Sequence, residues 1–339
     1  MLVLKNFVFS EMSVSVLFSA PYMVKNIARF GPLLKEFGVE LVVPNVEERL
    51  EAHDLLPFAG KVDGVICGDD RFSEEVLQRF LPKLKVISKW GTGLDSIDLK
   101  AAANLGIRVG NTPNAFTLPV ADNVLGWMLC FSRGLVAMDA AVKGGFWGKI
   151  PGVTLSEQTL GIVGLGNIGK AVARRARAFG MRVIATDPAP IAPDFLLEQS
   201  ITLVPLEQLL QQSDFVSLNC DLNPTSKHLI NAKSLALMKR NAVLINTARG
   251  PVVKEDDLIS ALQNQVIAGA ALDVFEIEPL PKNSPLLSMT NVFLAPHNCN
   301  SSPAAWERVH LNTIANLLSG LQIPFDRAEL EKKLKDSSK

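Results

Sequence analysis

Three ionisable side chains in the second half of the sequence each follow a short apolar run: Arg249, Glu278 and His297. Runs of this kind predict buried strands, and here they cover residues 242–246, 266–272 and 292–295. Ligands of open α/β sheets bind beyond the carboxyl ends of the strands, so we expect the three side chains at one rim. Considered alone, Arg249 is typical of a residue in a turn and His297 of a residue in a loop. The joint placement of the three side chains instead indicates a catalytic site.

These three residue types suit hydride transfer between a hydroxy acid and its oxo acid, when a dinucleotide is bound at the same rim. Arg249 can form a two-pronged contact with a carboxylate or polarise a carbonyl group. His297 can give a proton to the carbonyl oxygen as hydride reaches the carbon, and can take it back in the reverse direction. Glu278 paired with His297 would favour the imidazolium and fix the ring.

A glycine-rich turn supplies the expected dinucleotide site. Residues 159–169 read Thr-Leu-Gly-Ile-Val-Gly-Leu-Gly-Asn-Ile-Gly, which predicts a buried strand, a tight turn and the start of a helix. Gly164 would permit the turn, Gly166 would let the backbone approach a pyrophosphate, and Gly169 would let the helix pack on its strand. The next expected strand ends at Asp187, where a carboxylate would meet the ribose hydroxyls of NAD.

Two other interpretations of this turn stay open at the level of the sequence. Gly164, Gly169 and Lys170 fit most of a nucleotide-triphosphate loop, but Ala171 stands where that loop needs a hydroxyl for magnesium. The glycines could also serve packing alone. Dinucleotide binding is the favoured hypothesis.

Composition narrows the class of protein. The chain has 339 residues, enough for about two domains, and 48% of them are hydrophobic, which permits a sizeable core. Lys plus Arg equals Asp plus Glu at 34 each, so no net positive charge favours nucleic acid or a membrane surface. The four cysteines are scattered and the four histidines form no ligand pattern. We therefore expect no metal site and no disulfide framework, and a cytoplasmic location.

Strands alternate with helices in both halves of the chain, which predicts an α/β fold with two doubly wound parallel-sheet domains. In the first half we expect strands at 14–19, 39–43, 64–67 and 85–88, and helices at 23–37, 47–55, 73–80 and 99–105. In the second half we expect strands at 160–163, 181–186, 215–219, 242–246, 266–272 and 292–295. The expected helices there are 167–180, 206–212, 232–238 and 255–264, with a last helix at 303–318 that returns to the first domain.

The sequence also allows a structural prediction for each of three further segments. Two glycines in residues 91–93 suit either an anion-binding loop or an ordinary tight connection. One long apolar helix is expected from about 119 to 142, and its broad stripe favours burial either against a second subunit or in a central core. The strongly charged tail from Gln322 is expected to be a solvated or frayed end. His53, His228 and His310 are interpreted as structural or surface residues.

Four motifs in order make the chain resemble the D-isomer-specific 2-hydroxyacid dehydrogenases. They lie at 161–169, 238–250, 271–281 and 296–297, and the run Ile-Ser-Lys-Trp-Gly-Thr-Gly-Leu-Asp-Ser-Ile-Asp at 87–98 is similar to the phosphoglycerate dehydrogenase branch. The resemblance implies a Rossmann cofactor domain at 109–298 inserted in a discontinuous flavodoxin-like substrate domain at 1–108 plus 299–320. A charged tail at 321–339 and no regulatory domain are expected, as is a homodimer formed through the cofactor domains.

The resemblance also implies roles for individual residues. Arg249, Glu278 and His297 would be catalytic, and the backbone amides of Thr92 and Gly93 would bind the substrate carboxylate, with Arg249 and Lys89 as further substrate contacts. NAD would contact the following residues: Gly164, Gly166, Asn167, Ile168, Gly169, Asp187, Thr247, Ala248 and Asp273.

The sequence departs from the family pattern in two places. Asn298, Cys299 and Asn300 follow the histidine, where relatives commonly carry one hydrophobic and two small residues; Cys299 is interpreted as a packing residue rather than a reactive thiol. Where bacterial phosphoglycerate dehydrogenases place an arginine that contacts the substrate phosphate, this chain has Cys67, followed by Asp69 and Asp70. Lys89 or Arg71 would have to take the role of that arginine for a phosphorylated substrate.

We therefore expect an NAD-dependent oxidoreductase that interconverts a small D-2-hydroxy acid and its 2-oxo acid. The acids considered are 3-phosphoglycerate and glyoxylate or hydroxypyruvate. The alternative is an NADH-sensing dimeric interaction protein similar to the corepressors that share this fold. A formate or phosphite dehydrogenase ranks below both, because the substrate-site patterns of those enzymes are not evident.

Overall fold

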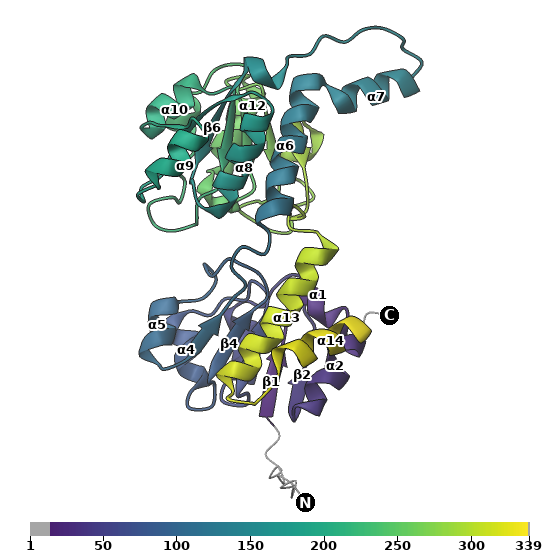
Figure 1. Cartoon of the computed structure of the whole chain (residues 1–339), viewed down its shortest axis with the longest axis vertical. Helices are drawn as coiled ribbons and strands as arrows, with labels where there is room; N and C mark the ends of the chain where they lie inside the picture. Colours follow the sequence, from purple (N-terminus) through teal and green to yellow (C-terminus); the bar gives the residue numbers. More distant parts are fainter. Residues whose placement is uncertain (1–13, 338–339) are drawn as a thin grey trace, which may run out of the picture. The chain divides into compact units, whose positions relative to one another are not determined.

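The computed structural model describes residues 14–337 and divides the chain into two compact units. Of the described residues, the first unit comprises 14–115 and 306–337, and the second comprises Phe116–Ala305. Each unit is built on one parallel sheet covered by helices, which confirms the α/β class with two parallel sheets (Figure 1). The chain crosses between the units a few residues later than the expected boundaries at 108 and 298.

The sheet of the first unit has five parallel strands in the order β2-β1-β3-β4-β5. Its central strands are buried throughout, as expected for a parallel sheet with helices on both faces. The strands are β1 Val14–Phe18, β2 Val39–Val42, β3 Gly64–Cys67, β4 Val86–Lys89 and β5 Arg108–Gly110. The helices are α1 Pro21–Val24, α2 Ile27–Glu36, α3 Ala52–Leu55, η1 Leu56–Phe58, α4 Glu74–Phe80, α5 Leu99–Asn104, α13 Pro303–Gly320 and α14 Arg327–Asp336.

Two helices of the first unit differ from the expectation. The single helix expected at 23–37 is divided into α1 and α2, with the break at residues 25 and 26. The helix expected at 47–55 is reduced to α3, because the backbone before it pairs elsewhere. Leu50 donates its N–H to the Asp70 carboxylate over 2.7 Å and accepts from the N–H of Arg71 over 3.0 Å. Strand β5 was not expected at all.

The charged tail is not a frayed end, because residues 327–336 form helix α14. Asp326 caps this helix by accepting from the N–H of Glu329, and Leu330 and Leu334 are buried at 1% and 2% exposure. Arg29 of α2 donates to the Leu334 carbonyl over 2.7 Å. Two leucines four residues apart form an apolar stripe that the surrounding charges conceal in the sequence.

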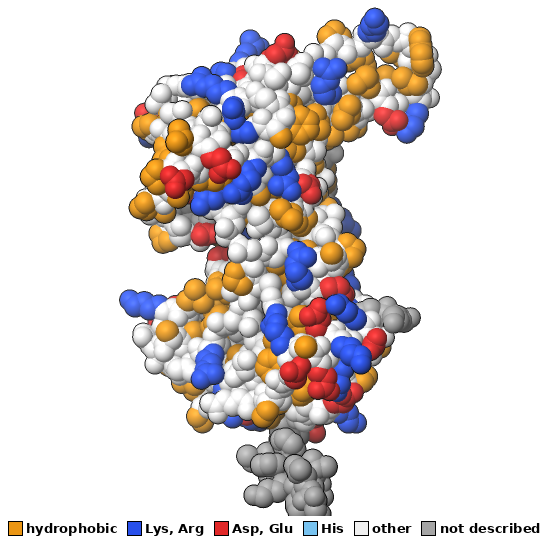
Figure 2. All heavy atoms as spheres, viewed as in Figure 1, with side chains coloured by type: hydrophobic (Ala, Val, Ile, Leu, Met, Phe, Trp, Pro, Cys, Tyr) orange, Lys and Arg blue, Asp and Glu red, His pale blue; other side chains and the backbone are white. Residues whose placement is uncertain are grey.

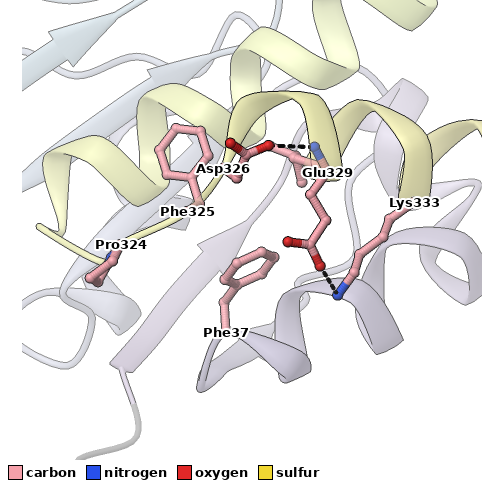
Figure 3. A pocket seen from close by; sticks show the side chains of 7 residues that line it. Phe37, Pro324, Phe325, Asp326, Glu329 and Lys333 are labelled. Carbon is pink, nitrogen blue, oxygen red and sulfur yellow. Dashed lines mark hydrogen bonds and ion pairs between the residues drawn. The ribbon is translucent and has the colours of Figure 1, made fainter. Parts of the chain in front are cut away.

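A pocket of about 440 Å³ lies beside α14 and the end of α2 (Figure 3). Its lining residues are Phe37, Pro324, Phe325, Asp326, Glu329, Leu330 and Lys333, and the figure shows the Glu329–Lys333 ion pair at its edge. None of the residues predicted to bind substrate or cofactor lines it, so the pocket is not the candidate active site.

The sheet of the second unit has seven parallel strands in the order β12-β11-β10-β9-β6-β7-β8. The first strand of this sheet along the chain, β6, lies inside the sheet, and β7 and β8 follow it towards one edge. The chain then returns to β9, which pairs with the other side of β6. This reversal between β6 and β9 is the place where open α/β sheets bind ligands. The strands are β6 Thr159–Val163, β7 Arg182–Thr186, β8 Thr202–Leu203, β9 Phe215–Leu218, β10 Val243–Asn246, β11 Gly269–Leu272 and β12 Val292–Leu294.

Helices cover both faces of this sheet over two apolar clusters. They are α6 Thr117–Arg133, α7 Leu135–Lys143, η2 Leu155–Glu157, α8 Asn167–Ala178, α9 Pro193–Glu198, α10 Leu206–Gln212, α11 Ala232–Leu235, η3 Gly250–Val252, α12 Glu255–Gln263 and η4 Pro285–Ser288. Helix α9 and strand β8 were not expected. Helix α11 is shorter than the helix expected at 232–238, and β11 is shorter than the strand expected at 266–272.

The long helix expected at 119–142 is two helices. Gly134 adopts φ +61° between them, and α6 and α7 are bent by 58° at this point. Helix α6 buries residues against the core, whereas no residue of α7 is buried, and Figure 1 shows α7 and the following loop extending away from the sheet of this unit. Within residues 14–337 no single helix has the length and apolar character to cross a bilayer; α6 and α7 meet that test only as this bent pair.

Candidate active site

The glycine turn between β6 and α8 has a geometry that two of its glycines impose. Gly164 adopts φ +89°, and a Cβ at this position would lie 2.8 Å from the backbone of Asn219. A Cβ on Gly169 would lie 2.1 Å from the Gly164 carbonyl oxygen. Both positions therefore exclude a side chain, which confirms the predicted strand, turn and helix.

Gly166 has a different role from its two neighbours. No atom lies within 4 Å of a Cβ built on it, so the backbone borders open space at the start of α8. The first amides of a helix have no acceptor within the helix, and they carry partial positive charge. Here these amides belong to the first turn, which begins with Asn167 and Ile168. The turn therefore presents unpaired amides and partial positive charge, the polarity that a pyrophosphate needs.

Asp187 follows β7 and is tied to the glycine turn. Its Oδ2 accepts from the N–H of Leu165 over 2.6 Å, and its Oδ1 accepts from the N–H of Ala189 over 2.8 Å. The carboxylate therefore fixes the turn. Since each carboxylate oxygen can accept more than one hydrogen bond, Asp187 can also receive ribose hydroxyls.

Unpaired polar atoms at the ends of two neighbouring strands fit a dinucleotide. Thr247 follows β10 and Asn219 follows β9; Thr247 Oγ1 and Asn219 Oδ1 are both buried without a hydrogen-bond partner within the described chain. Buried polar atoms in native proteins are normally paired, so these two point to a bound polar group. The N–H of Ala248, another predicted cofactor contact, instead donates to Asn246 Oδ1 over 3.1 Å.

Arg249 lies in the turn after β10, and this turn is held from two sides. Asn246, which is 1% exposed, donates from Nδ2 to the Arg249 carbonyl over 3.0 Å. Arg249 Nη1 donates to the Ala248 carbonyl over 2.8 Å. A Cβ on Gly250 would lie 1.8 Å from the Phe275 carbonyl oxygen, so the turn packs directly against the loop that carries Glu278.

Glu278 and His297 form a hydrogen-bonded pair. Glu278 Oε2 lies 3.1 Å from His297 Nδ1, and Glu278 Oε1 accepts from the N–H of Phe275 over 2.9 Å. An ionised carboxylate only accepts hydrogen bonds, so Nδ1 is the donor of this pair. The two side chains are 18% and 24% exposed.

His297 is held in a strained backbone conformation by Asp273. Its φ of +49° lies in the left-handed region, which is uncommon for a residue with a side chain. The N–H of His297 donates to the Asp273 carbonyl, and the buried Asp273 carboxylate accepts from the N–H groups of Asn298 and Cys299 over 2.6 and 3.0 Å. Asp273 was predicted as a cofactor contact; in the structure its carboxylate engages this loop.

Cys299 is 1% exposed, and burial together with the nearby Asp273 carboxylate raises the pKa of its thiol far above the ordinary value. A thiol in this setting stays protonated, in agreement with the prediction of a packing role. Among residues 14–337 no three His, Cys, Asp or Glu side chains are grouped as metal ligands.

A second histidine–carboxylate pair supports the same loop. His228 Nε2 lies 2.6 Å from Glu276 Oε1, and the N–H of Glu276 donates to Glu255 Oε2 over 3.1 Å. Burial raises the pKa of Glu255, and the neighbouring Glu276 and Glu278 carboxylates add to that shift. His228 was interpreted from the sequence as a structural or surface residue, since its partner lies 48 residues away. The signal that could have indicated it was Glu276, two residues before Glu278.

The predicted substrate residues Thr92, Gly93 and Lys89 belong to the first unit. Thr92 Oγ1 donates to the Thr112 carbonyl over 2.9 Å, and Asn111 Nδ2 donates to the Thr92 carbonyl over 2.6 Å. The loop is therefore fixed in shape. Within the second unit the structure pairs Glu278 with His297 and packs the turn of Arg249 against the loop that carries Glu278. It places the loop of Thr92 and Gly93 at the end of β4.

Comparisons with known proteins identify this architecture. The family described as "D-isomer specific 2-hydroxyacid dehydrogenase, NAD binding domain" matches residues 125–299. A glyoxylate reductase of Korarchaeum cryptofilum is 42% identical over 256 residues, which cover 74% of this chain and 75% of that protein. A D-3-phosphoglycerate dehydrogenase of Methanocaldococcus jannaschii is 39% identical over 244 residues, which cover 71% of this chain and 46% of that protein.

A solved structure agrees with these matches. The D-lactate dehydrogenase of Aquifex aeolicus, complexed with NAD and lactic acid, superposes with a TM-score of 0.82 at 26% sequence identity. The superposition covers 95% of this chain and 98% of that one.

Proposed function

The chain belongs to the D-isomer specific 2-hydroxyacid dehydrogenase family, and we propose that Arg249, Glu278 and His297 carry out its chemistry. The protein is an NAD-dependent oxidoreductase acting on a small 2-hydroxy or 2-oxo acid. The observation that carries the proposal is the 3.1 Å contact of His297 Nδ1 with Glu278 Oε2, at the strand ends of the sheet that bears the glycine turn. The net reaction joins a 2-oxo acid, NADH and a proton to give a D-2-hydroxy acid and NAD⁺.

His297 is the acid and the base in this account. NADH, when bound, would supply the hydride for the carbonyl carbon. His297 donates the proton from Nε2 to the carbonyl oxygen, and in the reverse direction Nε2 accepts the hydroxyl proton. Glu278 accepts from Nδ1, which fixes the tautomer and stabilises the charged ring.

Arg249 acts on the substrate's oxygens. A guanidinium forms two parallel hydrogen bonds with a carboxylate and can also polarise a carbonyl, a geometry that lysine does not reproduce. The hydrogen bond from Asn246 to the Arg249 carbonyl supports this role, because it fixes the backbone from which the Arg249 side chain extends. The backbone amides of Thr92 and Gly93 are further proposed carboxylate contacts.

The cofactor contacts follow from the glycine turn. The amides of Asn167 and Ile168 at the start of α8 would bind the pyrophosphate, and Asp187 would bind the ribose hydroxyls. The unpaired Thr247 Oγ1 supports a further contact. A carboxylate at residue 187 disfavours the extra phosphate of NADP.

We expect glyoxylate or hydroxypyruvate as the substrate, in keeping with the name of the Korarchaeum relative. The test is the loss of NADH absorbance when purified protein is given glyoxylate, hydroxypyruvate, phosphohydroxypyruvate or pyruvate. Turnover of at least one acid supports the proposal. Absence of turnover with all four, in protein that binds NADH, contradicts the substrate class.

We also propose a homodimer formed through α7 and the loop after it. This segment carries exposed apolar side chains, and Figure 2 shows hydrophobic surface along it: Leu135 45%, Val136 52%, Val142 49%, Phe146 56% and Trp147 90%. Surfaces of this kind usually meet another chain. Sedimentation should give a dimer that Val136→Asp converts to a monomer; a wild-type monomer at micromolar concentration would refute the proposed dimer.

The four free cysteines support a reducing cytoplasmic setting.

A further inference from the structure

Two neighbouring strands of the first unit bring opposite charges to one rim. Strands β3 and β4 are parallel and pair Cys67 with Lys89, so they end side by side. Lys89 is the last residue of β4, and Asp69 lies two residues beyond β3. The carboxyl ends of parallel strands are where α/β sheets bind ligands, so both residues lie where a substrate would be recognised.

Asp69 and Lys89 form an ion pair of unequal exposure. Lys89 Nζ lies 3.1 Å from Asp69 Oδ1; the lysine side chain is 4% exposed and the aspartate side chain 38%. A buried ammonium must be paired, so Lys89 depends on this carboxylate. The charge nearer to solvent is therefore negative, although the sequence places a lysine at this point.

Lys89 is also fastened to the loop predicted to bind the substrate carboxylate. Its Nζ donates to the Trp90 carbonyl over 3.0 Å, and residues 91–93 follow directly. Two of the three N–H donors of this ammonium are thus directed to Asp69 and to the backbone.

A second carboxylate holds the Asp69 segment in place. Asp70 is fully buried, accepts from the Ser19 hydroxyl, and accepts from the N–H of Leu50 over 2.7 Å. A Cβ on Gly68 would lie 2.9 Å from Pro21, so the chain before Asp69 is also tightly packed. Asp69 has little freedom to swing away from Lys89.

We propose that Asp69 determines substrate specificity by neutralising Lys89, so that the enzyme accepts small 2-oxo acids and rejects phosphorylated ones. This inference rests on the proposed function and names the substrate class of the same site. A phosphate group needs an unopposed arginine or lysine, and an acidic side chain nearby disfavours it. Lys89 would serve as that cation in the absence of Asp69.

The test compares hydroxypyruvate with phosphohydroxypyruvate, which differ by the phosphate alone. Wild-type protein should prefer hydroxypyruvate in kcat/KM by about 100-fold or more. Asp69→Asn should lower that preference by about 10-fold or more, mainly through KM for the phosphorylated acid, because Lys89 then loses the carboxylate that its Nζ contacts. In the double variant that also carries Lys89→Met, the improved kcat/KM for phosphohydroxypyruvate should disappear. That result would assign the improvement to Lys89.

Matched controls separate this effect from a general loss of surface charge. Glu331→Gln breaks the 2.7 Å ion pair with Lys335 in α14 and should leave the preference unchanged. Asp69→Glu keeps the charge and should keep the wild-type preference. Asp69→Ser provides the same test as the amide variant if that variant fails to fold. An unchanged preference in a folded Asp69→Asn or Asp69→Ser protein overturns the proposal, as does wild-type protein that uses both acids equally.

A binding measurement keeps the inference separable from the proposed function. Inorganic phosphate should raise the melting temperature of Asp69→Asn protein more than that of the wild type, by the stabilisation that any bound ligand gives; binding at the glycine turn is common to both proteins. This readout needs no turnover. If no 2-oxo acid is reduced, the proposed function fails while the phosphate response still decides the role of Asp69; equal responses of the two proteins overturn that role.

Discussion

The backbone N–H of Asp273 donates to the carbonyl oxygen of Asn246 over 3.0 Å. This bond joins the carboxyl ends of neighbouring strands β10 and β11. Beyond it, the Asn246 side chain binds the turn of Arg249, and the Asp273 carboxylate binds the loop after His297. Two proposed catalytic side chains are thus attached, through buried polar residues, to the same point of the sheet core. Fixed supports of this kind hold a catalytic geometry before substrate binds.

Asp273→Asn should impair catalysis and stability together. An amide replaces one carboxylate oxygen with an N–H₂ group and removes the negative charge, so the contact of Oδ2 with the N–H of Cys299 is lost and the contacts of Oδ1 are weakened. We expect a loss of about 1–3 kcal/mol in the free energy of unfolding and a fall in kcat of about 10-fold or more. Urea unfolding and NADH oxidation measure the two effects. Asp54→Asn, at an exposed helix start, is the control; a wild-type kcat in Asp273→Asn would contradict the proposed support.

Gly250→Ala should destabilise the protein by more than about 2 kcal/mol, because its Cβ would lie 1.8 Å from the Phe275 carbonyl oxygen. The Arg249 turn and the Glu278 loop would have to separate. Gly31→Ala is the matched control: it lies within α2 with nothing within 4 Å of the new Cβ, and it should stabilise by about 0.5–1 kcal/mol. Urea unfolding of both variants measures this difference. Equal stability of the two variants would show that the close approach is not a constraint.

The sequence predicted those parts of the fold that depend on local pattern. Apolar runs bounded by turns marked nearly every strand, and the helix with the cap Ser73 and the helix after the glycine turn appear as expected. The tail was misjudged because two leucines of α14 are hidden among charges. The long apolar helix was misjudged because the sequence did not show that Gly134 would turn left-handed and redirect α7.

The candidate site was predictable only as far as strand ends and residue types reveal it. Arg249, Glu278 and His297 each follow a strand, which is a local signal. The supports are long-range: Asp273 holds residues 297–299, and His228 holds Glu276 from 48 residues away. No spacing in the sequence reveals such a pair. The neutralisation of Lys89 by Asp69 depends likewise on the neighbouring ends of β3 and β4.

His310→Asn should weaken the dependence of the free energy of unfolding on pH in the acid range. Burial lowers the pKa of His310 from 6.5 to about 4, and its Nδ1 accepts from Trp90 Nε1 over 3.0 Å. Between these pH values the unfolded chain binds a proton that the folded chain does not, so stability falls as pH drops from about 6.5 towards 4. Across the whole range the free energy of unfolding should fall by about 3 kcal/mol because of His310. Asparagine does not titrate and still offers an oxygen to Trp90.

The comparison is urea unfolding across this pH window in wild-type and His310→Asn protein. Asp70, whose pKa burial raises to about 6, acts in the opposite direction but equally in both proteins. His53→Asn is the control, because that side chain is 82% exposed. Parallel profiles of wild type and His310→Asn would mean that His310 titrates alike in the folded and unfolded chains.

The most direct test of the catalytic assignment is single-turnover NADH oxidation by His297→Asn protein with the best 2-oxo acid. Asparagine tolerates the left-handed backbone at this position but cannot deliver the proton. The rate constant should fall by about 10²–10⁴-fold, while the dissociation constant for NADH, measured by fluorescence, stays within about 3-fold of wild type. Hydride transfer at the wild-type rate in this variant would contradict the role of His297 and the account built on it.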